Sequence, residues 1–64
     1  MADLGANLQS ARKRLRLTQV ELATRSGVHH TEVSRIERGV RDPQVSTLLR
    51  LAKGLDIEPG ELLK

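Results

Sequence analysis

Residues 17–39 read LTQVELATRSGVHHTEVSRIERG, and this stretch decides the fold. Its T-x-x-E pattern, beginning at Thr18, is that of a capping box and predicts a helix over residues 18–26. Gly27 ends this helix, because glycine readily adopts the left-handed conformation that follows many helices. A further helix is predicted over residues 30–38 after a short connection. The stretch therefore predicts a helix-turn-helix.

The rest of the chain also carries helical spacing. Apolar residues three and four positions apart predict a helix over residues 3–15. Asp42-Pro43 has the form of a cap and a first-turn proline, which predicts a helix over residues 44–54. Four residues of that helix are expected to face inward: Val45, Leu48, Leu49 and Ala52. Glu58-Pro59 opens a short fifth helix, and no strand pattern appears. We expect one all-α domain over residues 1–64, a compact five-helix bundle.

Composition excludes several classes of protein. The chain has 64 residues, no cysteine and no Phe, Tyr or Trp. The lack of cysteine excludes disulfide frameworks and thiolate metal sites, and the lack of aromatic rings argues against stacking on single-stranded bases. No apolar run approaches the roughly 20 residues that span a bilayer, and no signal peptide opens the chain. We expect a cytoplasmic protein that uses no membrane and no cofactor.

Basic residues concentrate in one part of the chain. Eleven Lys and Arg stand against eight Asp and Glu, which gives a formal charge of +3. Residues 12–41 have a balance of +5, from eight basic and three acidic residues, and the remainder has a balance of −2. One part of the molecule is therefore suited to face a polyanion, although a solvated basic surface would give the same pattern.

The helix over residues 30–38 has two different faces. At about 100° per residue, Val33 and Ile36 fall on one side and dock the helix on the core. The other side carries hydroxyls and guanidiniums, with His30 near the boundary: Thr31, Ser34, Arg35 and Arg38. Such a helix fits the major groove of B-DNA, where an arginine fork can bind guanine O6 and N7. For this helix alone, an ordinary solvated face remains the alternative.

The order of residues across both helices is more specific than a helical pattern. It includes the series Leu17-Thr18-Gln19-x-Glu21-Leu22-Ala23-x-x-x-Gly27-Val28 and Val33-Ser34-Arg35-Ile36-Glu37-Arg38-Gly39. It continues in Arg41-Asp42-Pro43 and Leu51-Ala52-Lys53-x-Leu55. This order resembles the Cro/CI-type (XRE-like) helix-turn-helix family over almost the whole chain. Restriction–modification controller proteins and small phage-type repressors are the branches that it resembles most. The resemblance implies a lambda-repressor-like DNA-binding domain.

The resemblance also implies roles for individual residues. In the family, the first, second and sixth residues of the recognition helix meet base edges, and here these are His30, Thr31 and Arg35. Ser34 and Arg38 share that face and are also base-contacting candidates. Three residues are expected to contact the DNA backbone: Gln19, Arg41 and, when protonated, His29.

Other expectations concern the support of the recognition helix. In the family, the residues that match Arg12 and Glu37 commonly form an interior salt bridge between the first helix and the end of the recognition helix. The chain departs from the family at His29, where Ser or Thr commonly caps the helix. Asp42 stands where Asn is common and is interpreted as a helix cap. Asp56 stands where glycine is usual, which is tolerable because Asp visits the left-handed region.

We expect a sequence-specific, double-stranded DNA-binding transcriptional regulator. One recognition helix touches only a few base pairs, so a homodimer on a pseudo-palindromic operator is expected. Apolar residues near the end of the chain exceed what one short helix needs and are expected at the dimer interface: Leu55, Ile57, Leu62 and Leu63. The alternative is that all four belong to the core.

Other functions stay open at this point. An enzyme is not expected, because His29 and His30 are adjacent and no carboxylate lies at HExxH spacing from them. The same adjacency argues against a metal site, which needs convergent ligands. A helix-turn-helix protein-interaction module is the main alternative, since a fold does not determine a function. A DNA-binding antitoxin or a fragment of a longer regulator would also fit.

Overall fold

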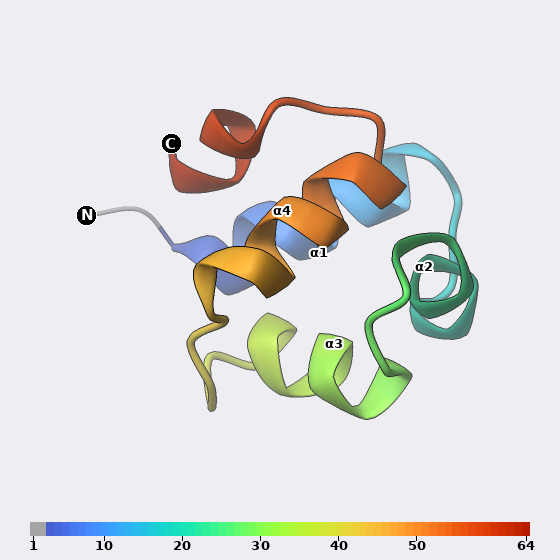
Figure 1. The fold of residues 1–64 in the computed structure, drawn as a ribbon, viewed down its shortest axis with the longest axis horizontal. Coiled ribbons are helices and arrows are strands. Elements are labelled where there is room, and N and C mark those ends of the chain that lie inside the picture. The colour runs from blue at the N-terminus through green and yellow to red at the C-terminus, as the bar shows by residue number, and fades with distance from the viewer. Residues whose placement is uncertain (1–2) are drawn as a thin grey trace.

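The computed structural model describes residues 3–64, which form four α-helices and one 3₁₀ helix (Figure 1). The elements are α1 (Leu4–Arg14), α2 (Gln19–Ser26), α3 (His30–Glu37), α4 (Val45–Gly54) and the 3₁₀ helix η1 (Pro59–Leu63). None of these helices is long and apolar enough to cross a membrane. The helix-turn-helix consists of α2 and α3, within one residue of the predicted bounds.

The prediction of a five-helix bundle is wrong, because the last helical segment is not an α-helix. It has only five residues, and Pro59 and Gly60 occupy its first two positions. Proline has no N–H to donate, and glycine loses more conformational entropy than other residues when it becomes helical. The backbone bond from Glu61 N–H to Glu58 O, at 2.9 Å, spans three residues, as in a 3₁₀ turn.

The helix ends follow the local chemistry of the sequence. Thr18 Oγ1 accepts from the Glu21 N–H at 3.0 Å, and Glu21 Oε1 accepts from the Thr18 N–H at 2.8 Å, so the capping box is confirmed. Gly27 ends α2 with φ of 74°, and Asp56 has φ of 57°, so both left-handed predictions are confirmed. Asp42 is not a helix cap, because α4 begins after Gln44, which makes no side-chain capping bond.

The core takes at least one aliphatic side chain from every helix. Seven of them are less than 2% exposed: Leu8, Leu22, Val33, Ile36, Leu51, Leu55 and Leu62. In α4 the buried pair is Leu51 and Ala52, with Leu48 packed against them. The prediction that Val45 and Leu49 face inward is wrong, since they are 72% and 50% exposed. The core-facing side of the helix consists of Leu48, Leu51, Ala52 and Leu55. Val45 and Leu49 lie beside that side and face solvent.

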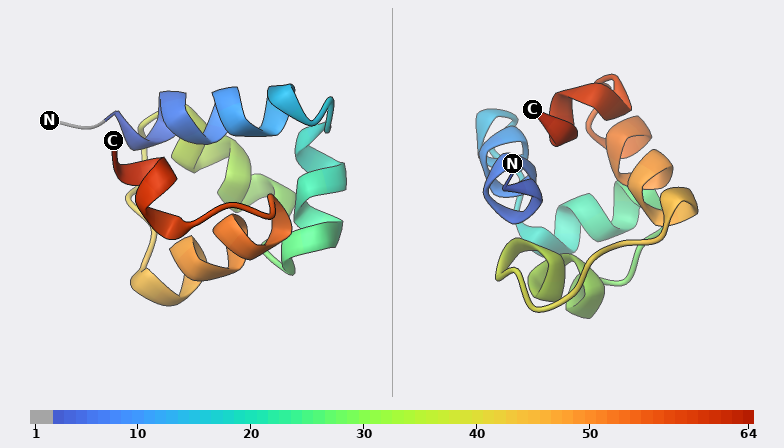
Figure 2. Two further views of the ribbon diagram at one scale, coloured as in Figure 1. Left: turned by 90° about the horizontal axis from the view of Figure 1, so that it is seen from above. Right: turned by 90° about the vertical axis from the view of Figure 1, so that its left-hand side faces the viewer.

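Close backbone contacts fix how the helices pack. Helix α2 packs against both α3 and α4, and α1 packs against α3 and η1 (Figure 1). A Cβ on Gly5 would lie 2.5 Å from Ile36 O and 2.7 Å from Glu37 O, so only glycine allows this approach of α1 to α3. The C-terminal segment returns beside the start of α1 (Figure 2), where Asn7 Nδ2 donates to Leu62 O at 3.0 Å.

Candidate nucleic-acid interface

Helix α3 presents a polar face to solvent and an apolar face to the core. Val33 and Ile36 are 0% and 1% exposed, as the spacing predicts. On the other face, His30, Arg35 and Arg38 are exposed, and two hydroxyl-bearing residues are half-buried: Thr31 and Ser34. Four of the five candidates for base contact therefore belong to α3, and Arg38 is the residue that ends it; the buried side chains of α3 set its orientation.

The first turn of α3 is capped by a histidine. His29 Nδ1 accepts a hydrogen bond from the Thr31 backbone N–H at 3.1 Å. The ring of His29 also stacks on that of His30, with 4.6 Å between centroids and 26° between planes. The sequence indicates only that His29 replaces a more common cap. It gives no sign that the two rings stack.

A buried ion pair joins α1 to the end of α3. Arg12 donates from Nε to Glu37 Oε2 at 2.6 Å and from Nη2 to Glu37 Oε1 at 2.9 Å. The Arg12 and Glu37 side chains are 10% and 2% exposed. The hydrogen bond to Glu37 raises the pKa of the Arg12 guanidinium above its ordinary value, against the lowering effect of burial.

Two further groups complete this network. Arg12 Nη1 donates to Leu17 O at 2.7 Å, which fixes the chain just before α2. Gln19 Nε2 donates to Glu37 Oε1 at 3.2 Å, which ties the first residue of α2 to the last residue of α3. No buried side-chain nitrogen or oxygen among residues 3–64 lacks a hydrogen-bond partner. The family resemblance implies a DNA-backbone contact for Gln19 but does not reveal that Gln19 also binds Glu37.

The loop after α3 carries a second, more exposed ion pair. Arg41 Nε lies 3.1 Å from Glu32 Oε2, and their side chains are 55% and 23% exposed. Sequence reasoning assigns Arg41 to the DNA backbone and gives Glu32 no role. Glu32 lies in the first turn of α3, so this pair connects the loop to the start of the same helix.

The four residues expected at a dimer interface separate into two groups. Leu55 and Leu62 are 1% exposed and belong to the core of the single chain. Ile57 is half-buried against that core, and Leu63 is 55% exposed. Leu49 lies exposed on the neighbouring face of α4.

The described part of the chain, residues 3–64, contains no group of three or more side chains placed to hold a metal ion.

Comparison with known proteins adds the decisive observation: a helix-turn-helix family model matches residues 8–62. The chain belongs to the helix-turn-helix family. The family resemblance of residues 17–39 is thereby confirmed.

Several helix-turn-helix proteins resemble the chain over most of its length. Control protein C.SmaI from Serratia marcescens is 40% identical over 60 residues, which are 94% of this chain and 71% of that protein. The crystal structure of restriction-modification controller protein C.AhdI from Aeromonas hydrophila gives a TM-score of 0.91 at 39% identity, covering 95% of this chain and 92% of that one.

A solved complex with operator DNA has the same fold. The P22 c2 repressor, from a Salmonella phage, was solved with a synthetic operator and gives a TM-score of 0.87 at 34% identity. That match covers 95% of this chain and 92% of the other. Against the full lengths of two curated relatives, both transcriptional regulators from Sinorhizobium fredii, this chain spans 26% and 78%. These relatives are transcriptional regulators and repressors rather than enzymes.

Proposed function

We propose that this chain is a sequence-specific, double-stranded DNA-binding transcriptional regulator that places α3 in the major groove. The observation that carries this function is the outer face of α3, where exposed guanidiniums and hydroxyls sit on a helix docked by Val33 and Ile36. The P22 c2 repressor, which has this fold and was solved in complex with a synthetic operator, supports binding to double-stranded DNA.

The residues of α3 have the chemistry that base recognition requires. Arg35 is exposed, and its fork suits O6 and N7 of guanine. Thr31 offers a hydroxyl to a base edge or its methyl group to thymine, and His30 can donate to guanine N7. Ser34 and Arg38 lie on the same face and reach either bases or phosphates.

Contacts to the DNA backbone would flank this helix. Gln19 begins α2, where free N–H groups and the helix dipole favour a phosphate. Arg41 lies in the loop after α3 and would contact phosphate on the other side, in exchange for its bond to Glu32. His29 lies exposed at the start of α3. Such contacts set the register of the protein on DNA and carry no sequence information by themselves.

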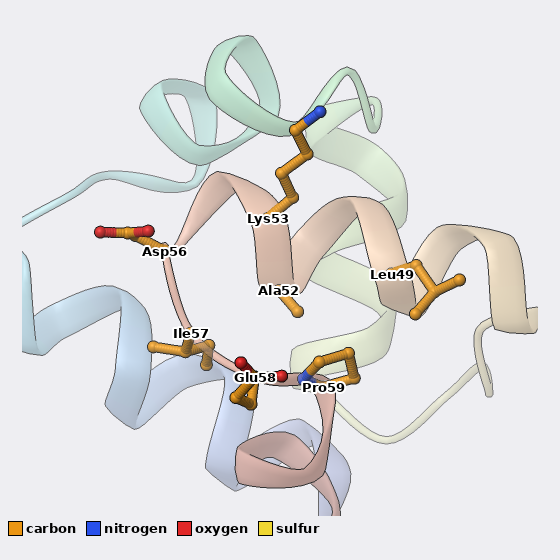
Figure 3. A pocket seen from close by; sticks show the side chains of 7 residues that line it. All are labelled: Leu49, Ala52, Lys53, Asp56, Ile57, Glu58 and Pro59. Carbon is orange, nitrogen blue, oxygen red and sulfur yellow. The ribbon is translucent and has the colours of Figure 1, made fainter.

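A second copy of this chain would bind at the surface formed by α4 and the segment that follows it. Leu49, Ile57 and Pro59 line an open hollow of about 400 Å³ there (Figure 3), together with Ala52, Lys53, Asp56 and Glu58. Leu63 lies exposed on η1, while Leu55 and Leu62 support this surface from the core. Paired recognition helices would then meet half-sites about 34 Å apart on a pseudo-palindromic operator.

Selection of bound duplexes from a random double-stranded pool, repeated at two salt concentrations, tests this function. We expect an inverted repeat to be enriched, because a dimer presents two identical recognition helices. If no sequence is enriched and binding weakens as salt is raised, the chain is a non-specific DNA binder. Absence of binding at both salt concentrations would refute DNA binding and favour a protein-interaction module.

Arg35→Ala is the matched variant for this selection. Because the Arg35 side chain is exposed and forms no hydrogen bond or ion pair with another residue among 3–64, its loss should not affect folding. We expect Arg35→Ala to lose about 1–3 kcal/mol of discrimination at one base pair while keeping its non-specific affinity. An equal loss of affinity for operator and for random DNA would show that Arg35 does not contact a base.

A further inference from the structure

Two imidazole rings are held in one arrangement at the start of the recognition helix. The bond from the Thr31 N–H to His29 Nδ1, at 3.1 Å, places the His29 ring over the first turn of α3. The His30 ring lies against it, with 4.6 Å between centroids and 26° between planes. Both side chains are exposed. The capping bond therefore fixes one ring, and that ring supports the other.

The capping bond also determines the chemical form of His29. A neutral imidazole has one donor nitrogen and one acceptor nitrogen, and here Nδ1 is the acceptor. The proton of the neutral ring therefore lies on Nε2. A protonated His29 would lose the acceptor and would place a positive charge at the positive end of the helix. The expected phosphate contact by protonated His29 would require this cap to break.

We propose that His29 is a positioning residue for His30, a role that rests on the proposed DNA-binding function. A histidine at the first position of a helix otherwise samples several χ1 and χ2 orientations, each of which points its ring nitrogens in a different direction. Stacking on a ring that is itself held by a hydrogen bond selects one of them. The base preference at the pair facing His30 therefore depends on His29, without a base contact by His29.

Substitutions at His29 can separate its ring from its cap. His29→Asn and His29→Ser retain a side-chain oxygen at the N-cap, where both residue types are strongly favoured, but they remove the stacked ring. His29→Ala removes both cap and ring. His30→Ala identifies the base pair that His30 reads. Agreement between His29→Asn and His29→Ser excludes a new DNA contact made by either substitute.

The measurement is the binding of each variant, at one salt concentration, to the selected operator and to operators changed at single base pairs. In the unsubstituted protein, an operator with a wrong base pair facing His30 should bind about 5- to 150-fold more weakly. We expect His29→Asn and His29→Ser to reduce that discrimination by about 2- to 10-fold, the range expected from an aromatic stack. Thermal unfolding midpoints should stay unchanged, as should discrimination at the pair facing Arg35. In a His30→Ala background, the same substitutions should have no further effect.

Several results would overturn this role. If His29→Asn and His29→Ser leave discrimination intact, or weaken binding equally at every base pair, His29 is only a helix cap. The inference would also be refuted if His30→Ala changed discrimination at no base pair of the operator. Sequence-specific binding by the unsubstituted protein would still stand in that case. Failure of the proposed function gives a different result, since the unsubstituted protein would then select no operator.

Discussion

Removing one partner of the buried ion pair between Arg12 and Glu37 should strongly destabilise this domain. Glu37→Gln preserves the shape of the side chain but removes the negative charge of the carboxylate, whose two oxygens accept hydrogen bonds from Arg12. The Arg12 side chain is only 10% exposed, so its guanidinium would remain buried without a counter-charge. Breaking one partner of such a pair costs about 3–5 kcal/mol.

That loss is large for so small a chain. At about 0.05–0.15 kcal/mol per residue, a domain of this length has a free energy of unfolding of roughly 3–10 kcal/mol. Each 1 kcal/mol shifts the melting temperature by about 4–8 °C in domains of this size, so Glu37→Gln should lower it by about 12 °C or more. Glu32→Gln is the matched control, because its pair with Arg41 is more exposed than the Arg12–Glu37 pair and should contribute at most about 1 kcal/mol.

Circular dichroism during heating and in urea is the appropriate assay, since the chain has no Trp or Tyr for fluorescence. The double variant Arg12→Met/Glu37→Met keeps the test informative if Glu37→Gln does not fold. Removing both charges leaves no unpaired ion, so the double variant should be more stable than either Arg12→Met or Glu37→Gln. The reasoning is refuted if Glu37→Gln melts no lower than Glu32→Gln, or if the double variant is the least stable.

Three further outcomes are expected. Arg41→Ala should weaken binding to all DNA sequences alike and reduce the salt slope by about one, and an unchanged slope would show that Arg41 contacts no phosphate. Gly5→Ala should destabilise the fold in thermal unfolding despite the better helix propensity of alanine, whereas Gly60→Ala, whose Cβ would meet nothing within 4 Å, should not. The hydrogen bonds from Thr18 to Glu21 lower the pKa of the Glu21 carboxyl. The ionised carboxylate therefore stabilises the fold fully above the ordinary carboxyl pKa, and this stabilisation is lost as the pH falls through the lowered pKa of the folded protein. The melting temperature of the unsubstituted protein should therefore approach that of Glu21→Gln between about pH 5 and pH 2, and a constant difference over that range would contradict the assignment.

Local signals account for what the sequence could predict. The capping box at Thr18 and the left-handed residues Gly27 and Asp56 involve neighbours in the chain, so residue types alone determine them. The docked face of α3 follows from helical spacing because Val33 and Ile36 are its only aliphatic residues. The same rule was insufficient for α4, whose several aliphatic residues allow more than one inward face.

Apart from the Arg12–Glu37 pair, which the family resemblance implied, the contacts between distant elements could not be predicted from the sequence. Gly5 reads as an ordinary weak helix residue, and only the position of α3 shows why a side chain is excluded there. Leu55 and Leu62 look superfluous in a short terminal segment until the packing of that segment on α1 and α4 buries them. Gln19 and Glu32 likewise acquire partners only when loops bring α3 beside its neighbours.

The recognition helix is held at both ends by groups that its outer face does not use. His29 caps its start, and Glu37 binds α1 and α2 at its end through Arg12 and Gln19. Under the proposed function, substitutions on the outer face are therefore expected to change sequence preference with little loss of stability. Loss of Arg12, in contrast, would release the helix end and weaken binding to every sequence, and in a binding screen Arg12 would resemble a DNA contact. Measuring stability beside affinity separates the two, because only a supporting residue lowers both.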